Sequence, residues 1–290
     1  MKDFPLPVRL VGAGSQLDDE EPLQYLDMPR GMDTFAMPQV PDDADANVLA
    51  IARDALAGYL KALARWDPTV GGEGPHLDLA CLPARALTVM NQVLGEGEVS
   101  IRIDGPVPYR IQESVFTGIW RVVGLDSGGH AATDALEAAP LPRAAIDAAR
   151  AATSTRLPDI TLPAGAMNSP ALLAEISGQL ATRKAGDRAH VINLTLFPMT
   201  PVDHRVLEAA LAVGPVAIMS RGFGNCRVTS TGARDVWRVQ YFNNMNTLIL
   251  DTLEIVDLPE VTLAAAEDLL DSRARMAELV EWMSESVAEA

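Results

Sequence analysis

The tripeptide Trp-Arg-Val occurs twice in this chain, at residues 120–122 and 237–239, and the two copies mark an internal repeat. When the sequence is shifted by 117 residues, positions 77–149 align with positions 194–266 without a gap. The aligned stretches share 19 identical residues in 73 positions, many more than unrelated segments of this composition share. Solenoid repeats are only about 20–50 residues long, so this period predicts a duplicated domain. We expect its two copies to pack about a pseudo-twofold axis.

The first copy, residues 46–150, mixes helices with short alternating strands. Apolar residues between 46 and 65 recur every three or four positions, which predicts a helix with one buried stripe that ends before Pro68. Alternating segments separated by Gly-containing turns then predict an antiparallel meander. The other elements expected in this copy are a strand at 76–79, a helix opened by Pro83, strands at 98–103, 109–115 and 119–125, a segment near 134–137, and a helix after Pro142.

The second copy, residues 169–290, predicts the same order of elements. Its first helix, at 169–183, has Ser169 as the expected N-cap and Pro170 as its first residue. The remaining expected elements are a strand at 191–196, a helix at 201–212, strands at 216–220, 226–231, 236–242 and about 247–256, and a long helix from Pro259 to about Met283. Helices and antiparallel strands do not alternate strictly, so the predicted class is α+β, built from two helix–strand–helix–meander–helix units.

Acidic residues gather at the two ends of the 290-residue chain. Residues 1–45 and 251–290 together account for the whole net charge of −16, so the middle is neutral. We expect residues 1–45 to form an extended acidic segment and residues 151–168 to link the two copies. Solvated ends that keep the protein soluble are one interpretation of this charge, and a docking field for a basic partner is the other.

Composition argues against several classes of function. A chain this acidic repels phosphate and anionic lipid, so neither nucleic acid nor an anionic membrane surface is an expected partner. No run reaches eighteen apolar residues, so membrane insertion is not expected either. The first ten residues contain no apolar signal-peptide core, which favours a cytoplasmic protein. Two cysteines and four scattered histidines show no metal-ligand spacing, and Gly12-Ala13-Gly14 lacks the third glycine of a dinucleotide loop. The sequence therefore predicts no cofactor, no metal site and no catalytic residues.

The two Trp-Arg pairs have a structural and a functional interpretation. Neighbouring residues on a strand point to opposite faces, so each strand would bury its Trp and present its Arg. The structural interpretation joins Arg121 to Asp134 and Arg238 to Asp251 in salt bridges. The functional interpretation treats each pair as an exposed hot spot for a partner. Because the pair is duplicated, the structural interpretation is favoured.

Features present in only one copy are better candidates for function. The segment Gly222-Phe-Gly-Asn225 replaces Gly105-Pro-Val-Pro108 of the first copy, and three asparagines at 243, 244 and 246 have no counterpart there. A glycine-flanked aromatic tip can approach a partner closely, although a plain hairpin turn would also explain the segment. The candidate partner-binding residues are Arg221, Phe223, Asn225, Trp237, Arg238, Asn243 and Asn244.

Cys226 is the one candidate nucleophile. It lies between Arg221 and Arg227, and a thiol near two guanidinium groups can have a lowered pKa. The competing interpretation is a buried strand cysteine, which Tyr109 at the matching position of the first copy favours. Cys226 therefore carries the alternative hypothesis of a thiol-dependent enzyme or redox protein.

Several long motifs resemble the HupH/HyaF family of hydrogenase expression and formation proteins. The most specific lie in the second copy: Arg221-Gly-Phe-Gly-Asn-Cys-Arg-Val228, Trp237-Arg-Val-Gln-Tyr-Phe-Asn-Asn244 and Asn246-Thr-Leu-Ile-Leu-Asp-Thr-Leu-Glu254. Gly97–Arg102, Ile111–Phe116 and Gly118–Arg121 of the first copy also match, as do Gly12–Gln16 and Tyr25–Pro29 near the start. The resemblance covers nearly the whole chain.

The resemblance implies an accessory role in maturing an uptake [NiFe]-hydrogenase. Members of the family are thought to be chaperones of the small, Fe–S-bearing subunit before its export, with other hydrogenase accessory proteins as further partners. No catalytic residues or bound cofactor come with the family. We therefore expect a non-enzymatic, cytoplasmic chaperone whose partner is the precursor of the hydrogenase small subunit, and whose acidic ends would suit a basic signal peptide.

Overall fold

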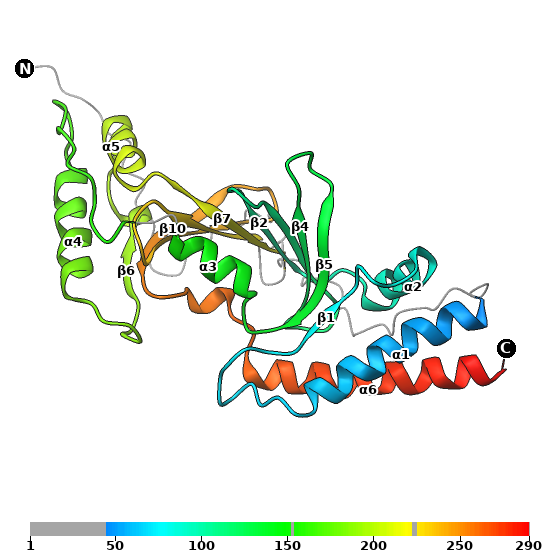
Figure 1. Ribbon diagram of the computed structural model, residues 1–290. Helices are drawn as coiled ribbons and strands as arrows, with labels where there is room; N and C mark the ends of the chain where they lie inside the picture. The colour runs from blue at the N-terminus through cyan, green and yellow to red at the C-terminus, as the bar shows by residue number, and fades with distance from the viewer. Residues whose placement is uncertain (1–44, 152–153, 222–224, 290) are drawn as a thin grey trace, which may run out of the picture. The chain divides into compact units, whose positions relative to one another are not determined.

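The computed structural model describes residues 45–151, 154–221 and 225–289. Its centre is a ten-stranded antiparallel sheet in the order β1-β5-β4-β3-β2-β7-β8-β9-β10-β6 (Figure 1). The strands are β1 (His76–Asp78), β2 (Val99–Ile103), β3 (Tyr109–Glu113), β4 (Ile119–Leu125), β5 (Ala131–Ala138), β6 (His190–Asn193), β7 (Val213–Ser220), β8 (Asn225–Thr231), β9 (Val236–Phe242) and β10 (Leu248–Ile255). The predicted acidic segment 1–45 lies, except for Asp45, outside the described residues.

Strands of the first predicted copy form one half of the sheet, and strands of the second copy form the other half. The halves meet where β2 pairs with β7. In that pairing Ile101 lies opposite Ile218, two residues that the shift of 117 aligns with each other. The order of strands outward from this pair is β2-β3-β4-β5-β1 on one side and β7-β8-β9-β10-β6 on the other.

Six helices pack on the described sheet, which gives the α+β class that the sequence predicts. They are α1 (Ala46–Leu63), α2 (Ala84–Leu94), α3 (Arg143–Ala151), α4 (Ser169–Thr182), α5 (Pro201–Leu211) and α6 (Ala266–Glu289). The α1 and α6 helices run side by side (Figure 1).

One face of the sheet carries a central core built from both halves. Alternation along β2 directs Ile101 and Ile103 to this face, where both are 2% exposed. Trp120 and Trp237 pack in the same core, under α3. This burial across the β2–β7 junction joins the two halves by apolar contact as well as by backbone hydrogen bonds.

The opposite face carries two separate cores, one toward each end of the sheet. In the first, α1, α2 and α6 cover Ile119 and Leu136. In the second, α4 and α5 cover Leu253 and Ile255. Between them, the middle of this face is not covered by any described helix, and polar side chains of β2, β3, β4 and β8 lie there beside apolar side chains of β7. We call this region the open sheet face.

Two predicted boundaries are wrong because a 3₁₀ turn intervenes, and two others are displaced: β7 begins at Val213 rather than 216, and α6 ends at Glu289 rather than near Met283. The strand expected at 191–196 ends at Asn193, and Leu194–Leu196 form a 3₁₀ turn that the Asn193 side chain caps. The helix expected from Pro259 begins at Ala266, because Pro259 instead starts a 3₁₀ turn at Glu260–Thr262. Apolar periodicity does not distinguish such a turn from the first turn of the following helix.

Ser169 is not the N-cap of α4, because its hydroxyl is used elsewhere. That hydroxyl donates to Oδ1 of Asp203, which also accepts from the backbone N–H of Met167, Asn168 and Ser169 at 2.8–3.0 Å. The other oxygen, Oδ2, accepts from the amide and hydroxyl of Thr200. Burial alone would raise the pKa of Asp203, but the hydrogen bonds from Ser169 and Thr200 outweigh it and hold the pKa well below its usual range. Asp203 thus ties the start of α4 to the start of α5.

Candidate partner-binding site

Four of the predicted partner-binding residues lie together at one end of the second half of the sheet. Arg221 follows β7, Asn225 begins β8, and Asn243 and Asn244 follow β9. All four are exposed. The Asn225 side chain donates to Oδ1 of Asn246 at 3.3 Å, which links the two hairpins. Phe223, another candidate, lies outside the described residues.

Asn243 also has a structural task in this cluster. Its Oδ1 accepts from the amides of Met245 and Thr247, both at 2.9 Å, and so closes the turn between β9 and β10. Apolar side chains beside the asparagines are exposed as well: Met245 of the turn is 85% exposed, and Ile249 of β10 is 56% exposed. This end of the sheet therefore offers both amide groups and apolar surface to a partner.

Trp237 does not belong to that exposed cluster. Its side chain is 2% exposed in the central core, so a partner cannot reach it without opening the core. The prediction of Trp237 as a contact residue is therefore wrong, and the core-anchor interpretation describes it. The same holds for Trp120, which is 1% exposed and whose Nε1 donates to the carbonyl of Ala139 at 2.9 Å.

Arg238 lies on the opposite face from Trp237 and makes the predicted salt bridge. Its Nε and Nη2 donate to the two oxygens of Asp251 at 2.9 and 2.6 Å. Arg121 forms the same bidentate pair with Asp134, with Nε and Nη2 donating at 2.9 and 2.6 Å. These hydrogen bonds raise the pKa of both arginines, since they stabilise the charged form.

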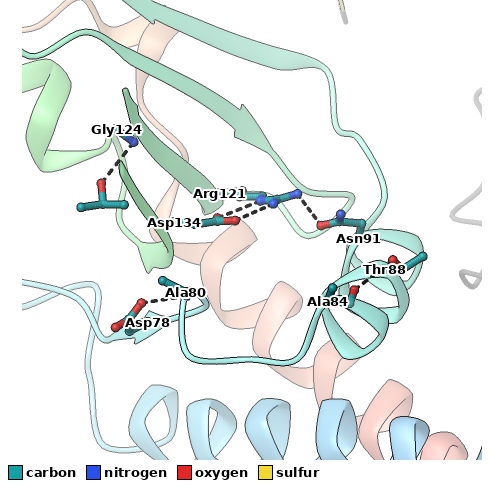
Figure 2. Close-up of polar contacts among 9 residues, drawn as sticks. Asp78, Ala80, Ala84, Thr88, Asn91, Arg121, Gly124 and Asp134 are labelled. Carbon is teal, nitrogen blue, oxygen red and sulfur yellow. Dashed lines mark hydrogen bonds and ion pairs between the residues drawn. The ribbon is translucent and has the colours of Figure 1, made fainter. Parts of the chain in front are cut away.

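Figure 2 shows Arg121 reaching from β4 to Asp134 on one side and to Asn91 of α2 on the other. The position that matches Asn91 in the second half is Glu208 of α5, whose charge contributes to the raised pKa of Arg238. Both Arg-Asp pairs therefore lie where the open sheet face meets a helix, α2 at one side and α5 at the other.

A groove of about 640 Å³ crosses the open sheet face between these two pairs. Its floor comes from both halves of the sheet, with Ile101 and Arg102 on one side of the junction and Ala217 and Met219 on the other. The polar and charged side chains along it are Ser100, Arg102, Asp104, Arg110, Gln112, Arg121, Arg227 and Thr229. A second cavity of about 290 Å³ adjoins it, shares Val213, Arg227 and Thr229, and is walled by His204 and Glu208 of α5.

Cys226 lies on the core side of the sheet, away from this groove. It is a free cysteine and is 5% exposed. Burial raises its pKa, and a hydrogen bond with Tyr241 offsets only part of that increase. The buried strand cysteine that the sequence favours is therefore confirmed, and the alternative of a pKa lowered by Arg221 and Arg227 is wrong, because Arg227, the next residue along β8, points to the opposite face. A thiol in this state is a weak nucleophile.

Metal binding and membrane insertion each require a particular grouping of residues. Within the described ranges, no three or more His, Cys, Asp or Glu side chains are grouped so that they could hold a metal ion. Among the helices that the structure describes, none is both long and apolar enough to span a bilayer.

Comparison with known proteins identifies the family. The model of the HupH hydrogenase expression protein C-terminal conserved region matches residues 50–157 and 166–283. The chain belongs to the HupH family. It is 44% identical to the hydrogenase expression/formation protein HoxQ of Cupriavidus necator, over 98% of this chain and 99% of HoxQ. It is 40% identical to HupH of Rhodobacter capsulatus, over 97% of this chain and 98% of that protein. The family that the sequence motifs resemble is therefore confirmed.

Two more distant HupH-family relatives complete the comparison. The hydrogenase-1 operon protein HyaF of Escherichia coli is 36% identical over 74% of this chain and 75% of HyaF. A solved structure of the hydrogenase expression protein HupH from Thiobacillus denitrificans is 28% identical, over 38% of this chain and 96% of that one, with a TM-score of 0.34.

Arg102, Arg110 and Arg227 of the groove were missed as candidate binding residues, although the sequence contains a signal for two of them. Arg110 and Arg227 are aligned by the repeat, as are Arg121 and Arg238. Each lies on a predicted strand at the alternate position to a buried residue, which directs it away from the core. Identical charged residues on the uncovered face of both copies are the pattern that indicates a shared polar surface.

Proposed function

We propose that this HupH-family protein is an accessory factor in the maturation of an uptake [NiFe]-hydrogenase. It would be a cytoplasmic, non-enzymatic chaperone that binds the precursor of the small, Fe–S-bearing subunit before export. The support is that the relatives matching nearly the full chain are named hydrogenase expression/formation proteins. A factor that holds a client needs a wide surface able to receive a polypeptide, rather than a small pocket that positions reacting groups.

The observation that carries this proposal is the open sheet face between α2 and α5. Its groove is formed by central strands of both halves, and its described side chains are mainly guanidinium, amide, hydroxyl and aliphatic groups. Arg121 in the groove and Arg238 in the adjoining cavity are already fixed by Asp134 and Asp251, so this surface is partly preorganised and a client need not order these side chains. The exposed residues Arg221, Asn225, Asn243 and Asn244 extend the proposed contact surface beyond the groove.

We infer that the two halves of the chain arose by duplication and are related by a pseudo-twofold axis at the β2–β7 junction. The palindromic strand order and the pairing of Ile101 with Ile218 support this inference. The two stretches matched by the family model, one for each predicted copy, support it as well. The groove would then cross the axis, so that a client is held by both copies at once.

The proposed function is tested by co-precipitation with the tagged full-length protein. Extracts contain the hydrogenase small subunit either as its precursor or in its mature form. We expect the precursor to be retained and the mature form to be retained less or not at all. Failure to retain either form would overturn the proposal, and so would equal retention of both, because binding would then have no relation to export.

The same system separates a chaperone from a thiol enzyme. Because the Cys226 thiol is buried and its pKa is raised, Cys226→Ser should leave hydrogenase activity in cells unchanged. Loss of hydrogenase activity, with normal amounts of the variant protein and normal retention of the precursor, would show that Cys226 has a chemical role.

A further inference from the structure

The groove on the open sheet face carries positive charge, although the chain has a net charge of −16. Arg102, Arg110, Arg121 and Arg227 line it, and Asp104 is the single carboxylate residue among its described lining. The sign of this local charge is therefore opposite to that of the molecule. Such a local reversal selects ligands by electrostatic complementarity and repels the basic segments that the rest of the protein would attract.

Three of these arginines are exposed and are not held by a buried carboxylate, so they can meet a ligand, although Nη1 of Arg110 also donates to the carbonyl of Tyr109 at 2.9 Å. Arg102 and Arg110 share Asp104, at 3.0 and 3.6 Å, and all three side chains are at least half exposed, so these ion pairs are easily exchanged. Arg227 has no carboxylate within ion-pair distance among the described residues, and its guanidinium lies over the ring of Phe242 at 5.7 Å. Arg121, by contrast, is held by the buried Asp134.

The spacing of the exposed arginines limits the size of the ligand. Arg110 lies on β3 and Arg227 on β8, with β2 and β7 between them. Arg110 is in register with Thr229, so Arg227 lies two residues further along β8. Three strand spacings and this offset separate the backbones of Arg110 and Arg227 by about 16 Å. A single carboxylate cannot contact both, whereas two acidic side chains about four residues apart, about 13 Å on an extended chain, come within reach of two long arginine side chains. The ligand that fits is therefore an extended polypeptide with more than one acidic group.

Apolar side chains lie between the charges. Val123, Pro215, Ala217 and Met219 also line the groove, and Met219 is 46% exposed. They would receive the apolar residues between two acidic residues of an extended segment. A nucleic acid fits this surface less well, because Asp104 lies in the groove and the surrounding chain is strongly acidic.

We propose that the groove binds an extended acidic segment of a partner polypeptide, with Arg102, Arg110 and Arg227 as its ligand-binding side chains. This inference rests on the proposed function, since it names the chemistry of the client segment that the chaperone holds. The acidic residues of that segment pair with the arginines on both sides of the β2–β7 junction, and its apolar residues pack on Ala217 and Met219.

Fluorescence anisotropy with a synthetic peptide tests this proposal directly. The probe is a labelled peptide of about nine residues with two glutamates about four residues apart, matched to the strand spacing, and valine or leucine between them. Its control carries glutamine in place of glutamate. With the full-length protein, we expect the glutamate peptide to bind at least about tenfold more tightly. That preference should weaken as the salt concentration is raised, because the contacts are charge pairs.

Variants of the groove arginines test whether the glutamate peptide binds in the groove. The double variant Arg110→Gln/Arg227→Gln should lose at least about tenfold in affinity for the glutamate peptide, because both charge pairs are removed. Arg188→Gln, which removes an exposed arginine outside the groove, should bind like the parent protein. A double lysine variant, Arg110→Lys/Arg227→Lys, keeps the charge and should retain most of the affinity. Circular dichroism confirms that each variant is folded before binding is measured.

Three results would overturn the proposal: equal binding of both peptides, unchanged affinity of the folded double glutamine variant, or tighter binding of a single-stranded oligonucleotide or an anionic vesicle through the same arginines. The assay contains no hydrogenase, so its outcome is distinct from that of the co-precipitation. If the peptide binds but the small subunit is not retained, the groove still binds acidic segments, and only the proposal that the small-subunit precursor is the client is overturned.

Discussion

Glu113 is a buried carboxylate at the end of β3. It is 6% exposed, and its Oε1 accepts a hydrogen bond from the amide of Gly118 at 3.0 Å. Burial raises its pKa from 4.5 to about 7, against the opposing effect of the bond from Gly118. The folded state therefore holds this proton at pH values where the unfolded chain has released it. Its contribution to stability is present below about pH 4.5 and is lost as the pH rises to about 7.

Glu113→Gln should remove this dependence, because glutamine keeps the accepting oxygen and cannot ionise. Relative to the parent, we expect the variant to gain on the order of 3 kcal/mol in free energy of unfolding between about pH 5 and about pH 8. Urea denaturation at several pH values measures this difference. Glu281→Gln, at an exposed position on α6, is the control and should follow the parent at every pH. A Glu113→Gln variant that also follows the parent would show that Glu113 titrates normally.

For individual residues, the sequence predicts salt-bridge partners better than it predicts the chemical environment of a side chain. The partners Arg121–Asp134 and Arg238–Asp251 follow from alternation on strands and from the repeat, and both are found. The buried Cys226 follows from the repeat as well, since Tyr109 at the matching position favours packing, whereas the nearby Arg221 and Arg227 suggest a reactive thiol that the structure does not show. The role of Asp203 is hidden from the sequence, since four of its six hydrogen bonds come from residues more than thirty positions away.

Among the elements, the turn between β3 and β4 is where α6 meets the sheet. Gly118 has a φ of +76°, and a Cβ at this position would lie 2.2 Å from Cδ2 of Leu269 on α6. Both the backbone conformation and the close contact require glycine. The position is therefore sensitive to substitution for two separate reasons.

Gly118→Ala and Gly129→Ala separate these two effects. Gly129 has a similar φ of +80°, but a Cβ there would have nothing within 4 Å, so its substitution costs only backbone strain, about 1 kcal/mol. Gly118→Ala should cost roughly 1–3 kcal/mol more, because Leu269 must move. Thermal unfolding of both variants measures the difference. Equal losses would mean that α6 does not pack against this turn.

Element types were predictable from periodicity, and element ends were not. The helix at 46–65 and the strand at 236–242 are found within two residues of their predicted limits, because their apolar patterns are long and regular. The start of α6 is displaced from Pro259 to Ala266, because a short 3₁₀ turn precedes it. Its packing on α1, in the other half of the chain, could not be predicted, since local periodicity does not say which partner a buried stripe meets.

At the scale of the whole described structure, one continuous sheet joins both predicted copies, and its open face is wider than either copy alone provides. The repeat in the sequence predicted two similar units but not their edge-to-edge pairing through β2 and β7. For that reason the groove across the junction could not be predicted, although its arginines lie at repeated positions. The predicted exposed residues 221, 225, 243 and 244 lie at one end of this sheet rather than in the groove.

The central claim is that a hydrogenase client lies in the groove of the open sheet face. Site-specific photo-crosslinking in cells tests it most directly, with the crosslinking residue placed at Met219 in the groove or at Val70, which is 82% exposed outside it. The account predicts a crosslink to the hydrogenase small subunit from position 219 and none from position 70. A crosslink from position 70 alone, or equal crosslinks from both positions, would contradict it.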